Sequence, residues 1–150
     1  NVMFCYDNFV MISRTLEGEF LDYRKVIPAD FKFKVRVKTR ELRSMIDRAA
    51  LITSNAIKSP IRCDFDFDTV KISTASNIGK FTEVINVPNF AEKLTVGFNN
   101  KFMLEALSAC DADEILIRLC TELTPIILEP VEGEDFLSMV LPMRLNLDLK

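Results

Sequence analysis

Histidine and tryptophan are absent from this chain of 150 residues, and only four glycines are present. Without histidine the chain cannot build a Ser-His-Asp or Cys-His catalytic set, and no imidazole can bind a metal. The glycines (Gly18, Gly79, Gly97 and Gly133) are too far apart to form a glycine-rich phosphate-binding loop. These absences argue against most hydrolases and nucleotide-dependent enzymes.

Cysteine is sparse and irregularly spaced. The four cysteines (Cys5, Cys63, Cys110 and Cys120) form no CxxC pair, and two of them fall in apolar, strand-like runs. We interpret them as small core residues of a protein kept in the reducing cytoplasm, rather than as disulfides or zinc ligands. No apolar run approaches the roughly 20 residues that a membrane helix needs, so no membrane partner is expected.

Charge is unevenly distributed along the chain. The formal net charge is −3, yet nine basic and only three acidic residues lie between Arg24 and Arg48, which gives that block a net charge of +6. A single basic block in an acidic chain indicates a local anionic partner. Hydrophobic residues make up 49% of the chain, enough to bury one ordinary core.

The spacing of apolar residues predicts strands and two helices. Phe31, Phe33, Val35 and Val37 alternate with cations, which is typical of a half-buried antiparallel strand. Residues 40–52 carry apolar side chains at helical spacing, with Thr39 as the expected N-cap. A hairpin is expected at 2–16, a second helix at about 100–109, and further strands at 61–67, 70–75, 81–87, 93–98, 114–120, 125–129 and 136–142.

An internal repeat accompanies these elements. Apolar residues recur at a spacing of 60: Leu42, Ile46 and Ala49 of the first helix correspond to Phe102, Ala106 and Ala109. The repeat favours an α+β domain of two β-α-β-β-β units, with both helices on one face of an antiparallel sheet.

Three groups of residues are candidates for function. Asp64, Asp66 and Asp68 alternate on one strand face, so they form either a cation site of a small metal-dependent hydrolase or an ordinary solvent-facing surface. Arg40, Arg43 and Arg48 lie on the polar face of the first helix, either as phosphate contacts or as a solvated face. The apolar run 138–145 is either a peptide-docking groove or the packing of a terminal strand.

Several stretches resemble the bacterial sliding clamp family, the beta subunit of DNA polymerase III. Residues 16–28 (LEGEFLDYRKVIP) are similar to the segment that joins the family's second and third domains, and 140–145 (VLPMRL) to its C-terminal ending. Gly97-Phe98-Asn99 and residues 49–52 (AALI) also fit the family.

The resemblance implies a DNA-clamp domain and its organisation. Residues 1–20 would be the terminal strands of the second domain, 21–30 the interdomain linker, 31–145 the third domain and 146–150 a tail. In the family, two subunits close into a homodimer ring around double-stranded DNA, which they hold without reading its sequence. Arg40, Arg43 and Arg48 would then face the DNA, and Leu51 and Ile52 would lie at the subunit interface.

The resemblance also implies a pocket for the short linear motifs of the replicative polymerase subunit, the clamp loader and repair polymerases. Half of the pocket would come from Leu21, Lys25, Val26, Lys58, Asn99, Phe102, Leu123, Pro125, Met139, Val140, Leu141, Pro142, Met143 and Arg144. Residues 146–150 (NLDLK) resemble a degenerate clamp-binding motif, or else form a disordered tail.

The resemblance thus implies a non-catalytic processivity subunit of a DNA polymerase, without cofactor or metal, working in the cytoplasm at the nucleoid. A generic α+β protein-interaction domain is the second hypothesis, and the metal-dependent hydrolase is the third.

Overall fold

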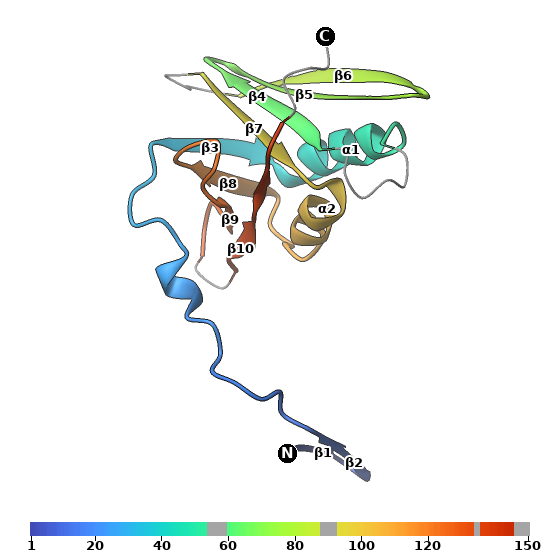
Figure 1. Cartoon of the computed structure of the whole chain (residues 1–150), viewed down its shortest axis with the longest axis vertical. Coiled ribbons are helices and arrows are strands. Elements are labelled where there is room, and N and C mark those ends of the chain that lie inside the picture. The colour runs from blue at the N-terminus through green and yellow to red at the C-terminus, as the bar shows by residue number, and fades with distance from the viewer. Residues whose placement is uncertain (54–59, 88–92, 134–135, 146–150) are drawn as a thin grey trace.

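The computed structural model describes residues 1–53, 60–87, 93–133 and 136–145. A hairpin of β1 (Val2–Tyr6) and β2 (Phe9–Ser13) opens the chain, as predicted, and lies at the far end of a long connecting segment (Figure 1). Every residue of both strands is exposed. Cys5 is therefore exposed, against our interpretation of the cysteines as core residues, because its strand lies apart from the core.

The connecting segment is not wholly irregular. A short 3-10 helix, η1 (Tyr23–Lys25), forms within it, with the Val26 amide donating to the Tyr23 carbonyl at 3.0 Å. Residues 1–25 are exposed, whereas Val26, Ile27 and Pro28 are half-buried.

The rest of the chain repeats one pattern. The first unit comprises β3 (Phe33–Lys38), α1 (Thr39–Ala50), β4 (Ile61–Asp66), β5 (Thr69–Ser76) and β6 (Gly79–Asn86). The second comprises β7 (Leu94–Phe98), α2 (Asn100–Ser108), β8 (Glu114–Leu119), β9 (Ile126–Pro130) and β10 (Ser138–Val140), and β11 (Pro142–Met143) follows.

The register of the repeat differs from the prediction by one residue. Leu42 and Ile46 are buried, and their counterparts 61 residues later, Met103 and Leu107, are buried as well. The predicted counterpart of Leu42, Phe102, is 57% exposed instead. A 60-residue shift therefore paired a core residue with a surface one.

The two units exchange their first strands. β3 pairs with β8 of the second unit, and β7 pairs with β4 of the first, all antiparallel. Two sheets result, of order β10-β9-β8-β3 and β11-β7-β4-β5-β6. The predicted α+β fold class is confirmed, but the strands expected in one sheet form these two, and the exchange decides which strands share a sheet.

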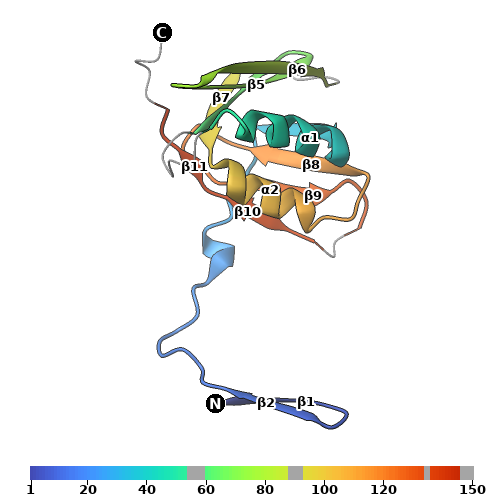
Figure 2. The same cartoon turned by 90° about the vertical axis from the view of Figure 1, so that its right-hand side faces the viewer.

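Both helices lie on the same side of the molecule, in front of the strands in Figure 2. The main core is formed by residues such as Ile46 of α1, Ile61 of β4, Ile72 of β5 and Ile115 of β8, each fully shielded from solvent. Burying one such side chain contributes about 1.5–3 kcal/mol, so this core holds helices and sheets in fixed positions.

The helix starts differ from each other. Asn99 caps α2, its side-chain oxygen accepting from the amides of Lys101 at 2.9 Å and Phe102 at 3.4 Å. Thr39, predicted as the N-cap of α1, is instead its first residue, and Lys38 occupies the cap position. The Thr39 hydroxyl donates to the Ala112 carbonyl at 2.6 Å, so a tertiary contact takes the group that capping would have used.

Candidate functional site

The C-terminal strand crosses from one sheet to the other. β10 pairs with β9, Met139 facing Ile127, and after Leu141 the chain joins β7, with Pro142 facing Phe98. Proline has no amide hydrogen to donate, which an edge strand tolerates. The crossing presents Leu141 to solvent between the two sheets.

Gly97 makes this crossing feasible. A methyl group placed on its Cα would lie 2.6 Å from the Met143 carbonyl oxygen and 2.9 Å from Cγ of Leu145. Any other residue would push the C-terminal strand away from β7. Sequence reasoning used Gly97 only as part of a resemblance, although a glycine inside a strand is itself a signal of close backbone approach.

Those predicted peptide-binding residues outside the linker that the structure describes belong to the crossing, to α2 with its cap and to the β8–β9 loop. α2 packs against β10, and Asn99 follows Phe98, which faces Pro142. Phe102, Leu123 and Leu141 are 57%, 62% and 61% exposed, so each offers a large apolar side chain to a partner. Met139, Pro142, Met143 and Pro125 are half-buried, Val140 is buried, and Arg144 is exposed.

Leu123 is held outward by its own loop. The Thr121 amide donates to the Thr124 hydroxyl at 2.8 Å, and that hydroxyl donates to the Thr121 carbonyl at 3.0 Å. The loop is thereby braced across its base, and Leu123 at its tip needs no core contact to keep its place.

The linker residues of the predicted pocket are mostly exposed. Leu21 and Lys25 are exposed, Lys25 pairing with Asp22 at 3.4 Å, and only Val26 is half-buried. Lys58 lies outside the described residues, as does the tail 146–150.

The three predicted DNA-contacting arginines are not equivalent. Arg40 and Arg43 are exposed on α1, and neither belongs to an ion pair recorded among the described residues. Arg48 instead donates to Glu83 of β6, with Nε 2.9 Å from Oε2, and this hydrogen bond raises the pKa of Arg48. Arg48 therefore ties α1 to β6, whereas Arg40 and Arg43 remain available to an anion.

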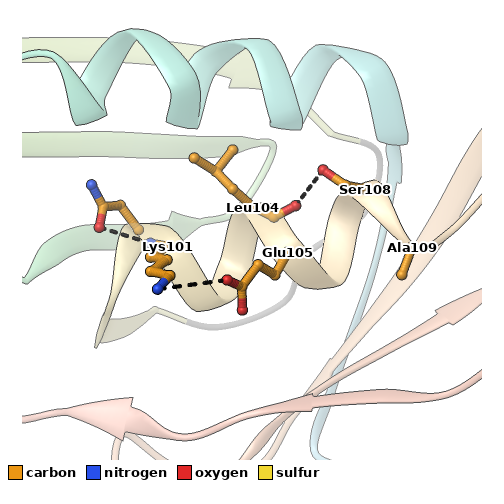
Figure 3. A pocket seen from close by; sticks show the side chains of 6 residues that line it. Lys101, Leu104, Glu105, Ser108 and Ala109 are labelled. Atoms are coloured by element: carbon orange, nitrogen blue, oxygen red, sulfur yellow. Dashed lines mark hydrogen bonds and ion pairs between the residues drawn. The ribbon is translucent and has the colours of Figure 1, made fainter.

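A shallow hollow of about 590 Å³ runs along α2 (Figure 3). Ser108 donates to the Leu104 carbonyl there, and Lys101 lies 4.0 Å from Glu105. Lys101 holds on α2 the position that Arg40 holds on α1, 61 residues earlier. Sequence reasoning missed Lys101 because the repeat was aligned one residue off.

The two aspartates of β4, Asp64 and Asp66, have separate partners, and Asp68 lies beyond the end of the strand that was predicted to carry all three. Burial opposes ionisation of Asp64, but hydrogen bonds from Arg62 and Thr95 outweigh it and lower the pKa of Asp64. Asp66 pairs with Lys93 at 2.8 Å, and Asp68 is exposed. No group of three or more possible metal ligands occurs in the described part of the chain, so the structure does not support the hydrolase hypothesis.

The predicted interface residues lie just after α1. Leu51 is 77% exposed and Ile52 is half-buried, its carbonyl accepting from the Ser76 hydroxyl at 2.7 Å. A large exposed apolar side chain at this corner is suited to contact with another protein surface.

Comparison with known proteins identifies the family. The model of the DNA polymerase III beta subunit, C-terminal domain, matches residues 24–144. The chain belongs to the DNA polymerase III beta subunit family. The resemblance noted from residues 16–28 and 140–145 is thereby confirmed.

Relatives and solved structures agree with this assignment. A beta sliding clamp of Staphylococcus epidermidis is 30% identical over 95% of this chain, which spans 38% of that relative's length. The DNA polymerase sliding clamp of Bacillus subtilis is 28% identical over 96% of this chain and 39% of its own, with a TM-score of 0.88. The DNA polymerase III beta subunit of Thermotoga maritima is 30% identical, and the match covers 91% of this chain and 37% of that protein, with a TM-score of 0.83. Among the described residues, no helix is long and apolar enough to cross a membrane.

Proposed function

We propose that this chain is the C-terminal part of a DNA sliding clamp, which tethers the replicative polymerase to DNA and docks the short motifs of clamp-binding proteins. The observation that carries the proposal is the family match over residues 24–144. Within this range the crossing from β10 to β11 leaves the side chain of Leu141 exposed. Because the chain spans 38% of the length of its curated relative, the ring and its partners are inferred for the whole protein.

The docking surface of this proposal is the exposed apolar set around the sheet crossing. Three exposed apolar side chains make up this surface: Phe102 of α2, Leu123 of the β8–β9 loop and Leu141 between β10 and β11. Asn99, which caps α2, and Arg144, which follows β11, supply polar groups. An exposed apolar surface with a few polar groups suits a short peptide with leucine and phenylalanine anchors. Val26 would add the linker's contribution.

Contact with DNA is assigned to the exposed polar face of the helices. Arg40 and Arg43 on α1 are the principal candidates, and Lys101 extends this set to α2. Arg48 contributes less, because Glu83 already neutralises it. Contacts made by charge alone carry no base readout, so DNA would be held without sequence preference and could slide.

The remaining roles follow from the same proposal. Leu51 and Ile52 would contact the other subunit of a homodimer ring, as the exposure of Leu51 supports. The protein would act in the cytoplasm, at the nucleoid during replication. It would be a non-catalytic processivity subunit whose work is binding.

Peptide affinity tests the docking proposal. A labelled peptide with leucine and phenylalanine anchors should bind this chain weakly in a polarisation assay. Leu141→Ala should weaken binding by about five- to thirtyfold, the loss typical of a truncated apolar anchor. Leu137→Ala removes an equally large exposed side chain from outside the predicted set, and it should leave affinity unchanged. Equal effects of the two variants would refute the assignment.

A further inference from the structure

Arg118, in the middle of the four-stranded sheet, is engaged from two sides. Its guanidinium pairs with Glu129 of the neighbouring strand β9. The ring of Phe31 lies over it, with the ring centroid 5.1 Å from Cζ of Arg118. An arginine held this way presents its flat face to the aromatic ring in one fixed orientation, which a lysine could not do.

The row of side chains that begins at Arg118 ends at the proposed docking surface. Arg118 faces Ile127 in β9, and Ile127 faces Met139 in β10, so the three share one face of the sheet. Ile127 is only 1% exposed although it lies outside the main core cluster. This face is therefore covered between Arg118 and Met139.

The linker is partly shielded from solvent at Val26–Pro28 and, after exposed Ala29 and Asp30, again at Phe31. All residues through Lys25 are exposed, Val26, Ile27 and Pro28 are half-buried, and Phe31 is half-buried over Arg118. Phe31 is the last half-buried side chain before β3, and Lys32, at the bend between them, is exposed. The contact of Phe31 with Arg118 thus holds the C-terminal end of the linker against the sheet.

We propose that Phe31, Arg118 and Glu129 form an anchor that fastens the linker to the four-stranded sheet and so positions Val26 for peptide docking. Glu129 fixes the guanidinium, the guanidinium holds the ring, and the ring fixes the end of the linker. The second half of this inference rests on the docking function proposed above. The first half, the fastening of the linker, stands on the contacts alone.

Limited trypsin digestion measures the fastening directly. Cleavage after Lys25 requires the half-buried residues Val26–Pro28 to detach and enter the protease, so its rate reports how often the linker lifts off. Cleavage after Arg14, in the exposed segment that follows β2, serves as the internal reference. Peptide affinity is measured on the same samples, and an unchanged unfolding midpoint verifies that each variant remains folded.

Four variants separate the anchor from a general loss of structure. Phe31→Leu removes the ring but keeps an apolar side chain, and Arg118→Lys keeps the charge and loses the flat face. Phe31→Tyr retains the ring and should behave as the wild type. The control Arg36→Lys alters an arginine on the same face, paired with Glu114, for which no ring contact is recorded in the described part of the chain.

Phe31→Leu and Arg118→Lys should speed cleavage after Lys25 by about three- to tenfold, the range expected for loss of a partly shielded cation–aromatic contact. Both should weaken peptide binding, while Phe31→Tyr and Arg36→Lys change neither readout. Unchanged cleavage in Phe31→Leu would overturn the anchor. Faster cleavage with unchanged affinity would overturn its link to docking. Faster cleavage in a chain whose wild type binds no peptide would refute the docking function and leave the anchor standing.

Discussion

Replacing Gly97 with alanine tests how the C-terminal strand is held. An alanine in place of a strand glycine ordinarily stabilises a protein by about 0.5–1 kcal/mol, because the unfolded chain loses freedom. Here the added methyl would lie 2.6 Å from the Met143 carbonyl oxygen, a backbone atom that cannot rotate away. We therefore expect the opposite sign, a loss of about 1–3 kcal/mol, the usual cost of overpacking.

Urea unfolding of this chain measures the change, and a second variant identifies its source. Leu145 contributes the other close contacts, at 2.8 and 2.9 Å from the added methyl. Adding Leu145→Ala to Gly97→Ala removes those contacts and leaves the carbonyl in place, so stability should not recover. An increase in stability for Gly97→Ala, or full recovery in the double variant, would refute the view that backbone crowding requires glycine. Peptide affinity should fall in both variants, since the strand that carries Leu141 is displaced.

Three further predictions concern charge and chemistry. In the full-length protein, Arg43→Glu should weaken DNA retention and reduce the slope of log affinity against log salt concentration by about one. Arg48→Glu should mainly lower the free energy of unfolding. Equal slopes for the two variants would contradict this difference. The pKa of Asp64 is lowered below its ordinary value of 3.8, so its stabilisation is present above that value and lost as pH falls through the folded-state pKa. Asp64→Asn should therefore flatten acid unfolding followed by circular dichroism, and an unchanged acid limb would contradict the assignment. Burial raises the pKa of the Cys63 thiol, so a thiol reagent should label exposed Cys5 at once and Cys63 only after unfolding; rapid labelling of native Cys63 would be inconsistent with its burial.

Local patterns in the sequence predicted the elements well. The alternation of Phe33, Val35 and Val37 with cations marks β3 because side chains of a strand alternate between its faces. The helical spacing of Leu42, Met45 and Ile46 marks α1 for the same kind of reason. These signals depend only on neighbours along the chain, so sequence alone reveals them.

Contacts between distant segments could not be predicted in this way. The exchange of β3 and β7 between the units depends on pairing across about 80 and 30 residues, which no local pattern encodes. The role of Thr39 changed for the same reason, since its partner Ala112 lies 73 residues away.

The candidate site shows the same division. The apolar run 138–145, which contains the exposed residue Leu141, is a candidate from its local pattern, and the resemblance of the C-terminal ending adds to it. The pairing of Arg48 with Glu83 and the stacking of Phe31 on Arg118 join residues far apart in the sequence, and only the structure reveals them.

Mapping peptide contacts by nuclear magnetic resonance tests the central claim most directly. The 15N-labelled chain is titrated with the leucine- and phenylalanine-anchored peptide, and amide shifts are followed residue by residue. We expect shifts centred on Met139, Leu141 and Met143 and extending to Phe102, with no shifts at residues 64–68, around the end of β4. No shifts at saturating peptide, or shifts centred away from the sheet crossing, would contradict the claim that this surface docks clamp-binding motifs.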